Sequence, residues 1–266
     1  HVIGATMRLW TYSDSCNMKH EGCCAESAVE DARRVCDKLG IDFYVMNFKD
    51  MFKDKVVDYF VDEYIHGRTP NPCIACNKYL KFDALLKKAL AMGIDYVATG
   101  HYAKIEKGED GKYILRASEA VKKDQSYVLY SLTQEQLAHT LFPLGGMTKP
   151  QIREMAEEQG LINARKHDSQ DICFVPDGDY TAFIERITKN KPRPGKFIHQ
   201  NGQVLGTHQG LIHYTIGQRK GLGIAYEYPL YVIDKDIASN TVILGPNDAL
   251  FQKALLAENC NLIAID

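Results

Sequence analysis

The first hundred residues alternate between short apolar segments and longer segments with helical periodicity. Apolar residues recur every three or four positions in the longer segments, as they do on the buried face of a helix. The expected strands are Val2–Leu9, Ile41–Asn47 and Asp95–Gly100. The expected helices are Ala25–Leu39, Asp54–His66 and Phe82–Met92. Strands that alternate with helices form a parallel sheet with helices on both faces. The sequence therefore predicts an α/β fold whose ligands bind beyond the carboxyl ends of the strands.

The pattern changes in the second half of the chain. From Gly195 onward, glycine, histidine and alternating β-type residues dominate, which predicts a β-domain. The expected elements beyond Gly100 are a hairpin over Lys104–Leu115, a helix over Thr133–Leu141, a helix with Thr148 as N-cap that runs to Gly160, and strands over Tyr231–Asp236 and Thr241–Leu244.

Composition restricts the class of protein. The chain has 45% apolar and 25% charged residues, as soluble globular proteins do, and no apolar run long enough to span a membrane. Its start lacks the basic region and apolar stretch of a signal peptide. Eight cysteines are too few for a disulfide scaffold in 266 residues. We therefore expect a cytoplasmic protein with reduced thiols. We also expect it to be a monomer. Because the chain opens in a strand without an initiator methionine, we also expect residues before His1 to be missing.

A basic segment lies between Arg186 and Tyr226. It holds seven lysines and arginines and no aspartate or glutamate, although the formal net charge of the chain is −2. An acid-free basic segment in a mildly acidic chain is typical of a surface that contacts phosphates. A solvated basic face without a partner is the alternative.

Cysteines gather at two places far apart in the sequence. Cys73 and Cys76 follow two prolines in Thr69–Lys78, and Cys173 lies in Asp168–Phe174. Because each proline fixes φ and restricts the residue before it, we expect a rigid loop that leads into a helix. The N-terminus of a helix favours the reactive thiolate form of a thiol held there. If the two places meet in the fold, the chain has an attacking sulfur and a donating sulfur.

Spacing alone leaves several uses of these thiols open. Cys73-x-x-Cys76 occurs in redox pairs and metal sites, but a four-cysteine zinc site needs a second pair that the sequence lacks. An iron–sulfur cluster held by both of these cysteines and Cys173 is more consistent with the residues. The turn at Gly100-His101 suits a nucleotide, because glycine lets a ligand approach the backbone, but an ordinary tight turn is the alternative. The sequence has no dinucleotide-binding, Walker A or nucleophile-elbow motif.

Five motifs follow one another along the chain. They are Asn71-Pro72-x-x-x-Cys76-Asn77-Lys78 with Lys81-Phe82, Ala98-Thr99-Gly100-His101-Tyr102-Ala103, Lys123-Asp124-Gln125-Ser126-Tyr127, Ile172-Cys173-Phe174, and Gly217-Gln218-Arg219-Lys220-Gly221-Leu222-Gly223. In order and approximate spacing, they resemble the bacterial tRNA-specific 2-thiouridylases (the MnmA or TrmU family). Members of that family use ATP to replace the C2 oxygen of the wobble uridine (position 34) of certain tRNAs with sulfur.

The resemblance implies a fold. It consists of a Rossmann-like parallel sheet of the ATP-pyrophosphatase type (adenine nucleotide alpha hydrolase-like), a small central domain and a C-terminal β-barrel. Residues 1–140 are then expected to form the nucleotide-binding catalytic α/β domain, without its N-terminal phosphate loop. Residues 141–226 would form the central tRNA-binding domain, and residues 227–266 the start of a truncated β-barrel.

The resemblance also implies roles for residues. Cys76 would be the nucleophile and Cys173 the persulfide intermediate, while Met7 and Gly100 would bind ATP, which acts with Mg²⁺. The implied partners are tRNA and a persulfide sulfur donor protein or sulfide. The residues expected to contact the target base or other parts of the tRNA are Asn71, Pro72, Cys73, His101, Lys123, Asp124, Gln125, Arg219 and Lys220.

Two departures from the family pattern change these expectations. The Ser-Gly-Gly-x-Asp-Ser loop that cradles the ATP pyrophosphate is absent, and Ser13-Asp14-Ser15 lacks the glycines and follows the wrong strand. We therefore expect this 266-residue chain to be inactive in tRNA adenylation. Position 73 is cysteine where many members carry aspartate, which favours the alternative in which Cys73, Cys76 and Cys173 hold a [4Fe-4S] cluster that relays sulfide. A catalytically inactive RNA-binding protein is a further alternative.

Overall fold

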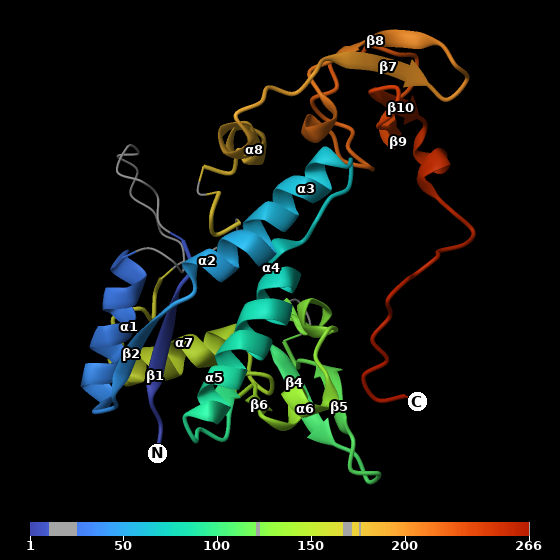
Figure 1. The fold of residues 1–266 in the computed structure, drawn as a ribbon. Coiled ribbons are helices and arrows are strands. Elements are labelled where there is room, and N and C mark those ends of the chain that lie inside the picture. The colour runs from blue at the N-terminus through green and yellow to red at the C-terminus, as the bar shows by residue number, and fades with distance from the viewer. Residues whose placement is uncertain (11–25, 121–122, 167–171, 176, 266) are drawn as a thin grey trace. The chain divides into compact units, whose positions relative to one another are not determined.

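A computed structural model describes residues 1–10, 26–120, 123–166, 172–175 and 177–265 (Figure 1). The chain divides into two compact units. The first unit consists of His1–Val57, Pro72–Pro176 and Asn259–Asp266, and the second unit of Asp58–Asn71 and Asp177–Glu258. The domain boundaries expected at residues 140 and 226 stay a prediction.

The first unit contains the predicted strand–helix–strand arrangement. Strands β1 (Gly4–Arg8) and β2 (Phe43–Asn47) pair in parallel, with Met7 opposite Met46. Helix α1 (Glu26–Leu39) connects them and lies against both strands (Figure 1). It ends at Gly40, whose φ of 66° suits glycine. The parallel α/β arrangement expected from the alternating sequence is confirmed here.

A second parallel pair is shorter than predicted. It joins β3 (Val97–Ala98) to β6 (Thr140–Leu141). The helix expected over Thr133–Leu141 is only α6 (Gln134–Ala138), because the residues after it pair with β3 through bonds such as Val97 N to His139 O at 2.9 Å. The predicted hairpin is confirmed as β4 (Ala103–Lys107) and β5 (Tyr113–Ala117).

The predicted cysteine loop is largely helical. An uninterrupted helix runs through α4 (Pro72–Ala75), η2 (Cys76–Leu85) and α5 (Leu86–Ala91), so it begins ten residues before the predicted start at Phe82. Pro72 suits the first helical position, because its fixed φ is helical and its missing N–H is not needed there. The η2 part is π-helical, with the wider i→i+5 bonding that is frequent at functional sites.

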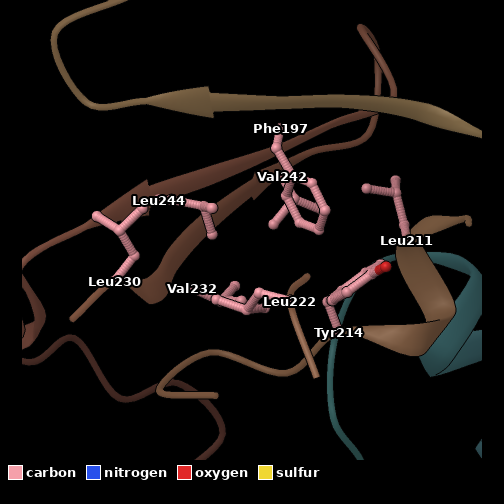
Figure 2. Packing of buried hydrophobic residues seen from close by; sticks show 8 residues of the cluster. All are labelled: Phe197, Leu211, Tyr214, Leu222, Leu230, Val232, Val242 and Leu244. Carbon is pink, nitrogen blue, oxygen red and sulfur yellow. The ribbon is translucent and has the colours of Figure 1, made fainter. Parts of the chain in front are cut away.

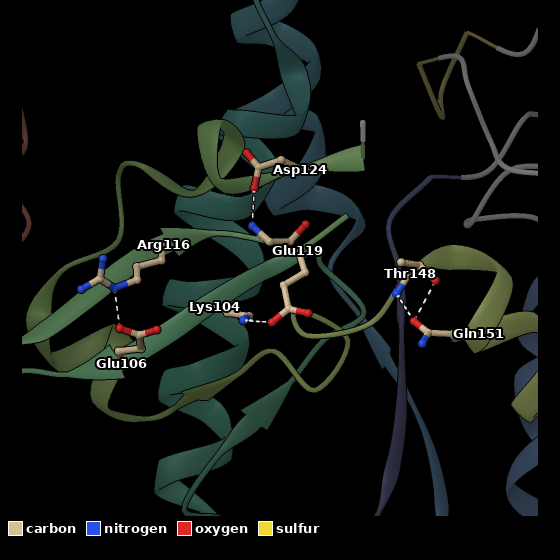
Figure 3. A network of polar contacts seen from close by, with 8 residues as sticks. Lys104, Glu106, Arg116, Glu119, Asp124, Thr148 and Gln151 are labelled. Atoms are coloured by element: carbon tan, nitrogen blue, oxygen red, sulfur yellow. Dashed lines mark hydrogen bonds and ion pairs between the residues drawn. The ribbon is translucent and has the colours of Figure 1, made fainter. Parts of the chain in front are cut away.

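Other helices complete the first unit. The segment before the cysteines is helical from α2 (Lys49–Phe52) through the π-helical η1 (Lys53–Asp58) to α3 (Tyr59–Ile65), and α3 belongs to the second unit. A 3₁₀-helix, η4 (Ser126–Leu129), follows the hairpin. Helix α7 (Lys149–Glu158) is confirmed after its predicted N-cap Thr148, whose N–H donates to Gln151 Oε1 at 2.8 Å (Figure 3).

The second unit is built around a four-stranded sheet in the order β8-β7-β10-β9. Its elements are α8 (Tyr180–Thr188), β7 (Gly195–His199), β8 (Val204–His208), η5 (Leu211–His213), β9 (Tyr231–Asp236), β10 (Thr241–Gly245) and η6 (Asn247–Leu250). Strands β9 and β10 lie where the sequence predicted them. Figure 2 shows the core under this sheet: Phe197, Leu211, Tyr214, Leu222, Leu230, Val232, Val242 and Leu244.

Two ring contacts attach α3 to the rest of the second unit. Phe60 and Phe183 lie 6.5 Å apart between ring centroids, and Tyr64 stacks on Tyr180 at 4.7 Å. Burial, with a contribution from Tyr180, raises the pKa of Tyr64 to about 12. Among the described helices, none is long and apolar enough to cross a membrane.

Candidate functional site

Cys73 and Cys76 lie on the first turns of the helix that begins at Pro72. Cys73 is exposed and Cys76 is buried, with 9% of its surface accessible. Ile74 lies between them and packs on a hydrophobic cluster of the first unit, whose buried members are Phe82, Ala103, Val128, Leu129, Leu132, Leu137 and Phe142. The apolar residue between the cysteines thus anchors the helix start, while Cys73 is presented to solvent.

The same cluster supports two further predicted segments. Ala103 directly follows Gly100–Tyr102, and Val128 closely follows Lys123–Gln125. Tyr102 N donates to Gln125 Oε1 at 3.0 Å, and Gln125 N donates to Tyr102 O at 2.9 Å. This reciprocal pair fastens the two segments to each other. The structure therefore brings together three of the segments that the sequence singled out.

Asp124 shapes its own segment. One carboxylate oxygen accepts a bond from Ser118 N at 2.8 Å, and the other accepts one from the Ser126 hydroxyl at 2.6 Å. Figure 3 shows this carboxylate beside the Lys104–Glu119 ion pair. Because Asp124 and Gln125 both fold the turn, Lys123 is the exposed side chain of the three.

His101 is enclosed by aromatic rings. Its accessible surface is 9%, and its ring centroid lies 5.8 Å from those of Phe82 and Phe142. A hydrogen bond of 2.8 Å joins its Nδ1 to the Thr99 hydroxyl. Burial, assisted by the positive charge of Lys81, lowers the pKa of His101 to about 3. The predicted RNA contact of His101 would thus come from a neutral ring and not from a cation.

An aromatic group holds the segment of Cys173. Phe174 is fully buried and packs edge-on against Phe52 at 5.6 Å, and against Trp10 at 6.5 Å. Trp10 follows β1, so partly exposed Cys173 is held near the carboxyl end of that strand. Helix α2, which carries Phe52, also contacts η2, which begins at Cys76. Both cysteine segments therefore neighbour α2. The predicted Asp168–Asp171 part lies outside the described residues.

The residues expected to bind ATP lie at strand ends. Met7 is half-buried near the carboxyl end of β1, and Gly100 is exposed just beyond β3. A Cβ added to Gly100 would meet only Leu144 Cδ1, at an ordinary 3.5 Å. The neighbouring protein atoms therefore do not demand glycine here, which is consistent with a ligand that approaches the backbone. Ser13-Asp14-Ser15 lies outside the described residues.

The three cysteines are not arranged as a metal site. Within the described part of the chain, which includes Cys73, Cys76 and Cys173, no three side chains of His, Cys, Asp or Glu are grouped so that they could hold a metal ion. The cluster held by Cys73, Cys76 and Cys173 stays an alternative prediction.

Arg219 and Lys220 lie on a loop of the second unit that Gln218 organises. The Gln218 side chain accepts from Thr215 N and donates to Lys220 O, both at 3.0 Å. Its backbone carbonyl accepts from Val232 N at 2.9 Å, which ties the loop to β9. Both basic side chains are exposed, as expected for residues that meet phosphates.

Sequence reasoning missed two cations of α7. Burial lowers the pKa of Lys149, and the positive charges of Arg153 and Lys123 lower it further, which places the three cations near one another in the first unit. Burial raises the pKa of Tyr102, the residue after His101, and the positive charge of Arg153 lowers it, so Arg153 also lies near this segment. No motif marks Lys149 or Arg153, because only the fold brings the start of α7 to the segment of Lys123.

Comparisons with known proteins agree with this fold. The chain matches the tRNA methyl transferase HUP domain over residues 1–177 and the tRNA methyl transferase PRC-barrel domain over residues 181–246. It is thus a HUP-domain protein of the Rossmann-like ATP-pyrophosphatase type, followed by a PRC-barrel-like domain.

Curated relatives specify the family. The tRNA-specific 2-thiouridylase MnmA of Clostridioides difficile strain 630 is 55% identical over 266 residues, which is 100% of this chain and 73% of the relative. MnmA of Clostridium perfringens strain 13 is 56% identical over 265 residues (100% and 74%), and MnmA 1 of Thermoanaerobacter sp. strain X514 is 57% identical over 267 residues (100% and 73%). The chain belongs to the MnmA family, which confirms the resemblance that the five motifs indicated.

Proposed function

We propose that this protein catalyses the ATP-dependent 2-thiolation of the wobble uridine, position 34, of tRNA. The observation that carries the proposal is the convergence of the cysteine helix, the Gly100–Tyr102 segment and the Lys123–Gln125 segment on one core. Relatives that align with the entire chain are named for this activity.

The first step of the proposed reaction activates the base. The C2 oxygen of uridine is a poor leaving group, so it is adenylated and then departs as AMP. ATP would lie at the strand ends near Met7 and Gly100, and Mg²⁺ would offset the charge of its phosphates. Asn71, Pro72 and Cys73 would contact the target base, which has to leave the anticodon stack to reach them.

The second step transfers sulfur. Cys173 carries a persulfide, whose outer sulfur bonds to C2 as AMP leaves. The Cys76 thiolate attacks the inner sulfur and breaks the S–S bond, so that the outer sulfur stays on the base and a Cys76–Cys173 disulfide forms. A dithiol reductant then supplies two electrons and returns both thiols. The position of α2 next to both cysteine segments supports this pairing.

We prefer the persulfide route, which the position of both cysteine segments next to α2 supports. The three cysteines are not grouped as metal ligands in the described residues, whereas one sulfur carrier and one attacking thiol need only meet in pairs. Under this route Cys73 would contact the target base and would not be a ligand of an iron–sulfur cluster. Under this route the sulfur donor would be a persulfide-bearing protein, which passes its outer sulfur to the Cys173 thiolate and is left with a thiol. Sulfide would be the donor only under the cluster route.

Contacts to the rest of the tRNA would come from both units. In the first unit, Lys123 faces solvent beside the turn that Asp124 and Gln125 fold, and Gln125 bonds to Tyr102, the residue after neutral His101. In the second unit, Arg219 and Lys220 project from the loop that Gln218 organises. These cations would hold phosphates, so binding is expected to weaken as salt rises.

Nucleoside analysis tests the proposal. The protein is expressed from its gene in a strain without another 2-thiouridylase, and 2-thiouridine in tRNA is measured by mass spectrometry. Cys76→Ser and Cys173→Ser are expected to abolish the modification, and the matched variant Cys260→Ser, which changes another exposed cysteine, is expected to leave it unchanged. Absence of 2-thiouridine with the wild-type protein would favour an RNA-binding protein without this catalysis, and full thiolation by Cys76→Ser or Cys173→Ser would contradict the roles given to these cysteines.

Two expectations about this 266-residue chain stay predictions. The first is that these 266 residues by themselves do not adenylate tRNA, because they lack the Ser-Gly-Gly-x-Asp-Ser loop. Transfer of labelled AMP from ATP to tRNA by this polypeptide would contradict it. The second is that it is a monomer, which light scattering coupled to gel filtration measures directly.

A further inference from the structure

Two tyrosines stand out on the surface of the first unit. Tyr127 and Tyr130 are 62% and 50% exposed, while Val128 and Leu129 between them are buried in the hydrophobic cluster. The two lie three residues apart along η4 and its C-cap, and side chains at this spacing in a 3₁₀-helix lie above one another. Tyr127 stacks on no other ring in the described part of the chain. We refer to Tyr127 and Tyr130 as the tyrosine pair.

The tyrosine pair is fixed beside the cysteine helix. Asn77, the residue after Cys76, is buried, and its side-chain N–H donates to Val128 O at 3.0 Å. Helix η4 also contacts both α4 and η2, the two helical parts that carry Cys73 and Cys76. One hydrogen bond thus joins Asn77, the residue after the proposed nucleophile Cys76, to Val128, the residue after Tyr127.

Three cations lie on the side of the tyrosine pair where η4 begins. Lys123 is exposed just before η4, and Lys149 and Arg153 lie near Lys123. Of the neighbouring carboxylates, Glu119 pairs with Lys104, while Asp124 accepts hydrogen bonds from Ser118 and Ser126 and keeps its charge. Exposed aromatic rings next to cations are the combination that holds single-stranded nucleic acid, since bases stack on the rings and phosphates meet the cations.

We propose that the tyrosine pair stacks the unpaired bases that flank the target uridine in the anticodon loop, with Lys123, Lys149 and Arg153 holding the adjoining phosphates. This inference rests on the proposed function. When the target base leaves the stack, its neighbours lose a stacking partner, and an aromatic ring replaces that partner without regard to which base is present. The pair would therefore stabilise the opened loop of any tRNA substrate and leave the choice of tRNA to other contacts.

Binding of short RNAs tests the inference. The probes are an anticodon stem-loop and versions of it with an abasic nucleotide on either side of the wobble uridine, each followed by fluorescence anisotropy. Tyr127→Ala is expected to weaken binding of the intact stem-loop at least about fivefold. Tyr127→Phe keeps the ring and should bind like the wild type. Tyr44→Ala, which removes a 48% exposed tyrosine of β2, is the matched control.

The abasic probes distinguish a loss of base stacking from a general loss of RNA-binding affinity. One of them should bind the wild type more weakly, and Tyr127→Ala should bind that probe and the intact stem-loop equally well. The inference is overturned if Tyr127→Ala binds the intact probe as Tyr44→Ala does, or if it weakens the intact and abasic probes by the same factor while its circular dichroism is unchanged. A wild-type protein that binds none of the RNAs would overturn the proposed function itself.

Discussion

The enclosed ring of His101 makes the stability of the first unit depend on pH. The pKa of His101 is lowered to about 3 in the folded chain, because of burial and then Lys81, against an ordinary value of 6.5. The unfolded chain therefore binds the proton more readily between these two values. The stabilising contribution of neutral His101 is complete above pH 6.5 and is lost as the pH falls toward 3.

The size of the effect follows from the two pKa values. At pH 5 this histidine is mostly protonated in the unfolded state and mostly neutral in the folded state. The free energy of unfolding is therefore about 2 kcal/mol lower at pH 5 than at pH 8. His101→Gln removes the titrating group and so should remove this part of the pH dependence. The variant will be less stable at every pH, but its stability should fall less between pH 8 and pH 5.

Urea unfolding followed by tryptophan fluorescence measures this difference. The sequence holds one tryptophan, Trp10, which packs against Phe52 and Phe174 and so reports on the first unit. His208, whose pKa burial also lowers, is present in both proteins and its effect cancels in the comparison. If the wild type and His101→Gln lose equal stability between pH 8 and pH 5, His101 is not held as a buried neutral ring, and the reasoning is refuted.

Four other substitutions have defined outcomes. Gly145→Ala places a Cβ 1.9 Å from Ala103 O and should cost about 3 kcal/mol or more, whereas Gly146→Ala meets only a lysine carbon at 3.9 Å and should leave the melting temperature almost unchanged in calorimetry. Asn77→Ala removes the bond to Val128 O and should cost about 1–3 kcal/mol, measured by urea unfolding. Cys73→Ser should slow thiolation in single-turnover assays less than about tenfold, and a complete loss would instead favour the cluster route.

Periodicity predicted the elements that carry a strong local signal. Helix α7 starts after Thr148 because that residue and Gln151 form a capping box, and β9 and β10 lie where β-type residues alternate. The start of the cysteine helix was missed because prolines normally indicate a loop. Here Pro72 occupies the first turn, where proline is compatible with a helix.

The sequence predicted which residues belong to the candidate site, but not how they contact one another. Motifs identified Cys76, His101 and Gln125, but no pattern in the sequence shows that Gln125 bonds to Tyr102 or that His101 is enclosed. These facts depend on contacts between segments that are distant in the chain, which local periodicity does not encode. Lys149 and Arg153 were missed for the same reason.

The discontinuous second unit imposes an order of events on the ribosome. Phe60 and Tyr64 are made more than a hundred residues before Phe183 and Tyr180, the rings that cover them. At about 5–20 residues per second, these apolar side chains wait about 6–25 s for their partners. During that interval the apolar side chains of α3 are exposed on the nascent chain and prone to aggregate, because the rest of the second unit has not yet been synthesised. Transient shielding by a chaperone, or slow translation that lets the first unit close beforehand, would therefore raise the yield of soluble protein.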